Sequence, residues 1–198
     1  MTVQLPGLAD PVHDAQTSFR ALLDALSHPG QPRTIPPFLT PPRDLNPACA
    51  IACLTLLDLE TEVWLSPEFP SEVGRWLVFH SGCRWGTDPG TADFALIRDI
   101  AELPDLTQFN PGTAEEPETA ATLLIQVPSL QGGEAVTLTG PGILGEQNIN
   151  LPVSAQFWVQ WRENVRQYPQ GIDIFFFSDR EVVGLPRTAQ LKPSEGER

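Results

Sequence analysis

The chain has 198 residues, of which 41% are hydrophobic, and a chain of this length can bury a sizeable core in one domain. Its 25 acidic residues outnumber 12 basic ones, and a formal charge of −13 disfavours binding to nucleic acid or to an anionic membrane surface. The only lysine, Lys192, lies in a polar segment. Neither a Schiff-base enzyme nor a Walker-type phosphate loop is therefore expected, because both need a positioned lysine.

The sequence carries no sign of membrane insertion or export. No apolar run reaches the roughly 20 residues that a membrane helix needs. Residues Met1–Asp10 lack the basic region followed by an apolar region that marks a signal peptide. Three cysteines, an odd and small number, are consistent with a reducing compartment. We therefore expect a cytoplasmic protein without a membrane partner.

Helices are predicted where apolar residues recur at helical spacing, often behind a capping residue. In the first of them the spacing is set by Phe19, Leu22, Leu23 and Leu26, with Asp10 or Asp14 as the cap. A proline-rich stretch then predicts an extended loop with at most a short edge strand. In chain order the predictions are a helix near His13–Ser27, the loop Gln31–Arg43, a helix from Asn46-Pro47, a helix capped by Ser71 that ends near Gly82, a short helical piece in Ile100–Gln108, and a helix over Val153–Gln167.

Strands are predicted from short apolar runs, and one pair of them is expected to form the centre of the protein. Leu123, Leu124 and Ile125 are apolar on consecutive positions and Val127 continues the row, which is typical of a strand buried on both faces. Gly132-Gly133 predicts a turn, after which Ala135–Thr139 would return as the second strand of a hairpin. The other predicted strands are Glu62–Ser66, Asp93–Arg98, Gly171–Ser178 and Val182–Leu185, the last two forming a second hairpin.

Alternating helices and strands, followed by two hairpins, predict an α/β fold. The arrangement expected is a three-layer sandwich with a mixed central sheet, because hairpin strands cannot be parallel. Residues 1–188 are expected to form a single domain. Residues 189–198 lose the periodicity and are expected to be a polar C-terminal tail.

Gly140–Gly145 matches the G-x-G-x-x-G pattern of dinucleotide-binding proteins. The pattern normally follows the first strand of a βαβ unit and opens a helix, whereas here a hairpin strand precedes it and a loop is predicted to follow. The favoured interpretation is a tight exit from the sheet that uses glycine's conformational freedom. A stand-alone nucleotide- or phosphate-binding enzyme that uses Gly140–Gly145 and Arg187 remains the alternative.

Asp173 stands out because it lies between Ile172 and Ile174 in a strongly apolar strand, where an unpaired charge is costly. Arg187, just past the neighbouring strand, is the expected partner. A structural ion pair is preferred over a catalytic one, since perturbed charged pairs mark functional sites only some of the time.

The spacing of the histidines and cysteines in the sequence does not predict a metal-binding or catalytic site. His28 and His80 are both predicted at helix C-termini, where the helix dipole favours a charged imidazole. No histidine has another at the spacing of a helical metal pair, and Cys49 and Cys53 are interpreted as small buried apolar side chains. No metal and no cofactor are expected. The aromatic stripe of Phe157, Trp158 and Trp161 is interpreted as core, or as an interface if part of it is exposed.

With these residues placed, the chain resembles the PhnH family, a subunit of the bacterial carbon–phosphorus lyase system. The resemblance runs from about Asp14 to Thr188, and its blocks fall in the family's order. They are SHPG (Ser27–Gly30), LTLLD (Leu54–Asp58), VWLS (Val63–Ser66), FH (Phe79-His80), GTAEEPETAATLLIQVPSL (Gly112–Leu130), LTGPGI (Leu138–Ile143), PQGIDIFFFS (Pro169–Ser178) and GLPRT (Gly184–Thr188).

The resemblance implies a fold like the large domain of pyridoxal-phosphate-dependent transferases, without the cofactor. It also implies a homodimer that works with the PhnG, PhnI and PhnJ subunits. With PhnG, PhnI and PhnL, the family supports transfer of the ribose triphosphate of ATP onto methylphosphonate with release of adenine. An enzyme subunit that is not catalytic by itself is therefore expected. The family supplies no established catalytic residue, and the candidates from motif position and chemistry are His28, His80, Asp173, Arg187 and Thr188.

Overall fold

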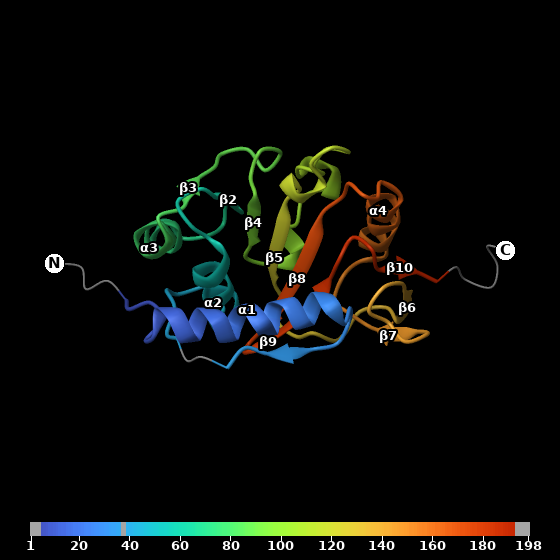
Figure 1. Ribbon diagram of the computed structural model, residues 1–198, viewed down its shortest axis with the longest axis horizontal. Coiled ribbons are helices and arrows are strands. Elements are labelled where there is room, and N and C mark those ends of the chain that lie inside the picture. The colour runs from blue at the N-terminus through green and yellow to red at the C-terminus, as the bar shows by residue number, and fades with distance from the viewer. Residues whose placement is uncertain (1–4, 37–38, 193–198) are drawn as a thin grey trace.

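A computed structural model of the protein describes residues 5–36 and 39–192 (Figure 1). Its largest element is a seven-stranded sheet in the order β1-β9-β8-β5-β4-β2-β3. The five strands from β8 to β3 run parallel, whereas β9 is antiparallel to both of its neighbours, so the prediction of a mixed sheet is confirmed. The strands are β1 (Arg33–Thr34), β2 (Glu62–Leu65), β3 (Arg84–Trp85), β4 (Phe94–Ile97), β5 (Thr122–Gln126), β8 (Asp173–Ser178) and β9 (Glu181–Leu185).

A smaller antiparallel sheet has the order β10-β6-β7. It contains β6 (Val136–Thr139), β7 (Gln147–Ile149) and β10 (Gln190–Leu191). The predicted central hairpin is therefore wrong: β5 pairs in parallel with β4 and β8, while β6 belongs to the other sheet. The physical reason is that β5 is apolar on both faces, which suits the interior of a parallel sheet covered on both sides.

The second predicted hairpin is confirmed, since β8 and β9 pair antiparallel. The short strands β3, β7 and β10 were not predicted, and β7 lies in the segment expected to be loop. The first residues of the predicted C-terminal tail belong to the fold, because Ala189 is buried and Gln190–Leu191 pairs with β6. The rest of that predicted tail, 193–198, lies outside the described residues.

Hydrophobic clusters lie on both faces of the large sheet. One face packs on helices α1 (Pro11–Ser27), α2 (Pro47–Leu56) and α3 (Ser71–Ser81), and the other on α4 (Ala155–Arg166) and the small sheet. Alternate residues of β8 explain this, because Phe175 and Phe177 join the first cluster, whereas Ile174 and Phe176 join the second. Short 3₁₀ turns are η1 (Ile100–Glu102), η2 (Leu106–Gln108) and η3 (Pro117–Thr119).

Capping residues set where the helices begin. Asp10 caps α1 by accepting hydrogen bonds from the N–H groups of Val12 and His13, and the bond from His13 holds the pKa of Asp10 below its ordinary value. Asn46 caps α2 through Cys49. The predicted cap at Ser71 is wrong by one position: Pro70 precedes the helix, which forms without a side-chain cap.

The aromatic stripe of α4 faces the core. Phe157, Trp158 and Trp161 are each no more than 5% exposed, so these rings are not available to a partner. In contrast, Phe19 and Leu23 of α1 are about half exposed, at 50% and 54%. Half-exposed apolar side chains therefore lie on both helices, at Phe19 and Leu23 of α1 and at Val159 of α4, but the aromatic rings of α4 are buried.

Candidate functional site

Asp173 and Arg187 form the ion pair that the sequence predicts. Asp173 begins β8, and Arg187 follows β9, so the antiparallel pairing of these strands brings them together. The guanidinium Nη2 and Nε lie 2.6 and 3.1 Å from Asp173 Oδ2, and the Arg187 backbone N–H donates to Oδ1 at 2.7 Å. Both side chains are mostly buried, at 12% and 21% exposure. The carboxylate is thus paired and hydrogen-bonded, as a charge in an apolar strand requires.

Arg187 also holds two loops against the sheet. Its Nη1 donates to the carbonyl oxygens of Pro117 at 2.8 Å and Pro169 at 3.3 Å. All three nitrogens of the guanidinium are thereby bound to protein groups. This geometry favours the structural interpretation of the pair over an anion-binding one. Thr188, the next candidate, is half-buried in the turn before β10.

The Gly140–Gly145 pattern forms a turn between β6 and β7. A strand follows its third glycine, and no helix opens there, as the sequence analysis expects. The first glycine has φ of 125° and the second 81°, values that favour glycine. The segment is therefore a tight turn that links two strands of the small sheet. In dinucleotide-binding proteins the corresponding turn leads into a helix whose N-terminus binds the pyrophosphate, and β7 stands in that place here.

His28 is the C-cap of α1 and is oriented by a carboxylate. Its Nδ1 lies 2.9 Å from Asp24 Oδ1, and the other oxygen of Asp24 accepts from Arg33. When Nδ1 donates to Asp24, Nε2 is left as the basic nitrogen, and the side chain is 46% exposed. A histidine held in this way has the orientation that a general base needs.

His80 is placed elsewhere and is used differently. It lies in the last turn of α3, and its Nε2 is 3.0 Å from the carbonyl oxygen of Leu5. Its ring packs on Trp76, with ring centroids 4.9 Å apart. The carboxyl end of α1 lies beside the small sheet, whereas α3 lies at the other end of the molecule (Figure 1). The structure therefore does not bring His28 and His80 together.

A polar network at the carboxyl edge of the large sheet was not predicted. Buried Gln126, at the end of β5, accepts from the backbone N–H of Asn46 at 2.5 Å and donates to the carbonyl oxygens of Asp44 and Arg98. A glutamine ending a run of buried apolar residues was the one sequence signal for it. Because its amide is fully used, this residue positions the start of α2 against β4 and β5.

Next to it, Arg98 pairs with Glu102, and this hydrogen-bonded ion pair raises the pKa of Arg98. The Ser66 hydroxyl donates to Glu102 at 2.9 Å and accepts from the backbone N–H of Arg98 at 3.1 Å. The hydrogen bonds and the ion pair of Ser66, Arg98 and Glu102 are therefore made within this group.

A cleft of about 450 Å³ lies between the carboxyl ends of β5 and β8 and the small sheet. Four carboxamide side chains line it, and we call it the carboxamide cleft. Buried Ile149, Leu151 and Val183 supply apolar surface. The residues that supply polar groups are Ser129, Gln131, Gln147, Asn148, Asn150, Ser178 and Glu181.

Residues 6–192 match the sequence model of the family described as bacterial phosphonate metabolism protein (PhnH). The chain belongs to the PhnH family. It is 36% identical over 188 residues to the alpha-D-ribose 1-methylphosphonate 5-triphosphate synthase subunit PhnH of Rhizobium meliloti (strain 1021), covering 93% of each chain. It is 30% identical over 182 residues to HtxG of Stutzerimonas stutzeri, a protein assigned provisionally as a C-P lyase subunit, covering 89% of this chain and 85% of that one.

Three blocks that carry the PhnH resemblance meet at the carboxyl end of α1. They are SHPG, LTGPGI and GLPRT. A β-carbon built on Gly142 would lie 2.1 Å from the carbonyl oxygen of Ser27, and one on Gly140 would lie 2.6 Å from that of Thr188. Glycine is required at these contacts because the backbones approach so closely. The junction of these blocks, with His28 at its rim and the carboxamide cleft beside it, is the candidate functional site of this PhnH protein.

Across the described ranges, the structure gathers no group of three or more His, Cys, Asp or Glu side chains that could hold a metal ion. Lys192 forms an ion pair with Glu146, at 2.6 Å. Helices long and apolar enough to cross a bilayer are also absent from residues 5–36 and 39–192.

Proposed function

We propose that this protein is an accessory subunit of a carbon–phosphorus lyase assembly. In that assembly it supports, with PhnG, PhnI and PhnL, the transfer of ribose 5-triphosphate from ATP to methylphosphonate with release of adenine. The observation that carries the proposal is the similarity along nearly the whole chain to a relative named as a subunit of that synthase. Subunit PhnJ is a further proposed partner.

An accessory role fits the chemistry of the described residues. Arg187, Asp173 and His80 are engaged in bonds that hold the fold together, whereas His28 bonds through Nδ1 and its side chain is 46% exposed. The alternative of a stand-alone nucleotide- or phosphate-binding enzyme needs Arg187 free to bind an anion. The hydrogen bonds from its guanidinium to Asp173, Pro117 and Pro169 count against that alternative.

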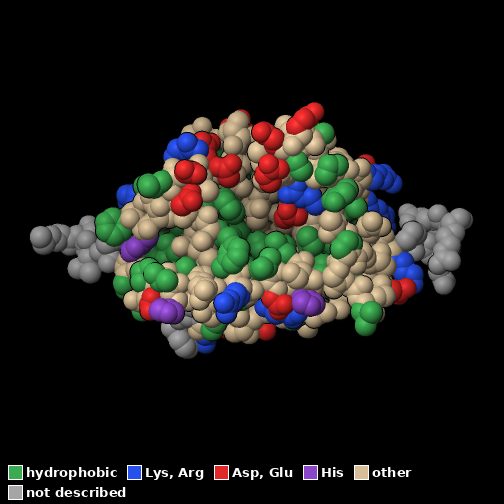
Figure 2. Space-filling model, viewed as in Figure 1, with side chains coloured by type: hydrophobic (Ala, Val, Ile, Leu, Met, Phe, Trp, Pro, Cys, Tyr) green, Lys and Arg blue, Asp and Glu red, His purple; other side chains and the backbone are tan. Residues whose placement is uncertain are grey.

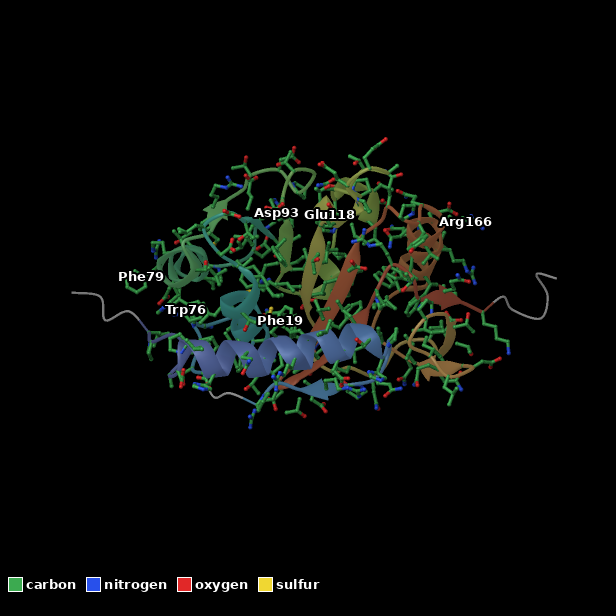
Figure 3. All side chains as sticks on the ribbon, in the orientation of Figure 1. Phe19, Trp76, Phe79, Asp93, Glu118 and Arg166 are labelled. Carbon is green, nitrogen blue, oxygen red and sulfur yellow. The ribbon has the colours of Figure 1, made fainter. Side chains whose placement is uncertain are left out.

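The distribution of apolar and acidic side chains on the surface is also consistent with a protein that binds other subunits. An apolar band crosses one face of the molecule, between α1 and an upper edge rich in carboxylates (Figure 2). Phe19 lies on α1 within this region, and Asp93 and Glu118 lie at the upper edge (Figure 3). An apolar surface with an acidic rim suits a partner segment that is apolar with basic flanks, such as a surface of another subunit. A second copy of this acidic chain fits less well, because like charges would meet.

Other implications of the family resemblance belong to the proposal as well. They are a homodimer, a cytoplasmic location, and a fold related to the large domain of pyridoxal-phosphate-dependent transferases without the cofactor. The burial of the α4 aromatic rings removes the reason for placing the dimer interface on that helix. Light scattering at micromolar concentration tests the homodimer, and a monomer would contradict it.

Co-expression of the subunits tests the proposed function. The purified chain alone should release no adenine from ATP, whereas the set with PhnG, PhnI and PhnL should release it, and omission of this chain should abolish that release. Turnover by the isolated chain, or full activity of the assembly without it, would contradict the proposal.

The apolar band is tested by Phe19→Ser combined with Leu23→Ser. Both side chains are half exposed, so the fold should survive while co-purification with the other subunits is lost. The matched control is Val159→Ser, because Val159 is 49% exposed on α4. Equal co-purification of both variants would place the contact elsewhere.

His28 is tested in the assembled complex. His28→Gln should lower adenine release by about a hundredfold or more if the imidazole transfers a proton. The control is His13→Gln, because His13 contacts Asp10 in a similar way at the other end of α1. An unchanged rate in both variants would remove His28 from the catalytic candidates.

A further inference from the structure

We propose that the carboxamide cleft binds the nucleoside part of a nucleotide, a purine with its ribose, and leaves the phosphates outside. This rests on the proposed function, in which ATP is the substrate of the assembly, and it assigns one part of that substrate to this chain.

The first support is the position of the cleft. It lies at the carboxyl ends of the adjacent parallel strands β5 and β8, and α/β sheets bind ligands outside this edge. Segments far apart in the sequence line it together: Gly30 after α1, residues 128–130 after β5, and Ser178 at the end of β8. Each of these segments ends a sequence block on which the PhnH resemblance rests. Parts of the family pattern that are far apart in the sequence thus meet at one cavity.

The second support is the chemistry of the walls. A purine has flat apolar faces and an edge of alternating hydrogen-bond donors and acceptors, and ribose adds hydroxyl groups. Carboxamides offer both a donor and an acceptor, so four of them can match such an edge. Buried Ile149, Leu151 and Val183 offer apolar surface for a ring. The volume of about 450 Å³ lies within the usual range for small-molecule sites.

The third support is charge. Glu181 is the only charged side chain among the described residues that line the cleft, and no lysine or arginine is among them. Two arginines are adjacent in sequence to lining residues: Arg33 is paired with Asp24, and Arg180 donates from Nη2 to the carbonyl oxygen of Pro36 at 2.9 Å. A triphosphate would find no cation here and would be repelled by a protein of charge −13. The phosphates should therefore point out of the cleft, where a partner subunit can bind them.

Two of the carboxamides are not used by the fold. Asn148 accepts from Thr137, and the Gln147 side chain donates to a backbone carbonyl. In contrast, within the described residues the side-chain amides of Gln131 and Asn150 take part in no hydrogen bond. These two are therefore the groups best placed to bind a ligand, and replacing them should leave the fold intact.

Calorimetric titration of the full isolated chain with adenosine, ATP and inorganic phosphate tests the inference. Adenosine should bind with a dissociation constant near or below about 1 mM. ATP should bind no more than about threefold tighter than adenosine, and phosphate should not bind. Gln131→Leu combined with Asn150→Leu should weaken adenosine binding at least about tenfold. A second variant, Ser129→Trp at the exposed rim, should block the cleft, whereas the control Gln16→Leu on exposed α1 should bind as the parent does.

Three results would overturn the inference. The first is that adenosine does not bind even at a concentration of about 10 mM. The second is that the parent and both cleft variants bind adenosine equally well. The third is that ATP binds more than about tenfold tighter than adenosine. The outcome is separable from that of the proposed function. A chain that binds adenosine but fails to join the other subunits would contradict the assembly role alone. A chain that assembles and supports adenine release without binding adenosine would contradict the cleft alone.

Discussion

The charge at the start of β8 illustrates how a single residue is tolerated in an apolar strand. Asp173 meets the guanidinium of Arg187 in two contacts and the Arg187 backbone N–H in a third. Arg187 in turn joins the segments that contain Pro117 and Pro169. Removing either partner would leave a mostly buried charge without compensation, which costs more than the intact pair contributes.

We therefore expect Arg187→Ala to lower the free energy of unfolding by about 3 kcal/mol. Urea denaturation measures this. Arg187→Ala combined with Asp173→Ala should cost at least about 1 kcal/mol less than the two single changes added together, because the double variant leaves no unpaired charge. Additive costs would show that the two groups are not coupled.

Thiol reactivity is a second prediction at this scale. Cys49, Cys53 and Cys83 are all buried and free, and burial raises the pKa of the Cys49 and Cys83 thiols. Since thiolates are the reactive form, a thiol reagent at pH 8 should label none of them quickly in the folded chain and all three after unfolding. The raised pKa keeps the Cys49 and Cys83 thiols protonated, so the contribution of these two groups to stability is full below pH about 8.5 and declines at higher pH. Fast labelling of the folded chain would contradict this burial.

At the scale of elements, helix α1 lies unusually close to β9. A β-carbon built on Gly184 would be 2.5 Å from the carbonyl oxygen of Ala25 and 2.8 Å from the backbone nitrogen of Leu26. These are backbone atoms, which cannot move aside as a flexible side chain can. Glycine at this position therefore sets the distance between α1 and the sheet, and with it the position of His28.

Gly184→Ala should lower the free energy of unfolding by about 1 to 3 kcal/mol, because α1 must move away from β9. The matched control is Gly90→Ala, at an exposed position where the nearest contact, at 3.3 Å, is a side-chain atom of Asp88. That change should alter stability by no more than about 0.5 kcal/mol. Thermal or urea unfolding measures both, and equal effects would contradict the close packing of α1.

At the scale of the whole molecule, the two sheets and the end of α1 form one junction that contains the candidate site. The net charge of −13 acts on the same scale, since it destabilises the compact state through self-repulsion. Acidic side chains gather at the upper edge of the face shown in Figure 2. This excess of negative charge fits association with less acidic partners.

Added salt should therefore stabilise the isolated chain. Raising NaCl from about 10 to 500 mM should increase the free energy of unfolding by up to about 1 kcal/mol, because screening weakens the repulsion. The effect should shrink at pH 5, where protonation removes part of the negative charge. Loss of stability on adding NaCl at neutral pH would show that favourable ion pairs outweigh the repulsion.

Local patterns predicted the elements that are long and strongly patterned. Within the described residues, four features follow from periodicity, caps and the cost of a lone charge. They are the α-helices, the strands of the large sheet that exceed two residues, the antiparallel pair β8 and β9, and the pairing of Asp173 with Arg187. The short strands β3, β7 and β10 could not be predicted in the same way. They have two or three residues each, and only their pairing partners hold them in place.

The sequence by itself determined an acidic α/β protein with a mixed sheet and a single lysine, because composition and local periodicity are properties of neighbouring residues. Its ordered motif blocks gave the resemblance to the PhnH family. Only the tertiary structure decided that β5 and β6 belong to different sheets, that Gln126 organises the carboxyl edge, and that Phe19 rather than Trp158 is exposed. The physical reason is that strand partners, buried hydrogen bonds and the exposed side of an amphipathic helix depend on segments far apart in the chain. The carboxamide cleft arises in the same way, since no single stretch of sequence contains it.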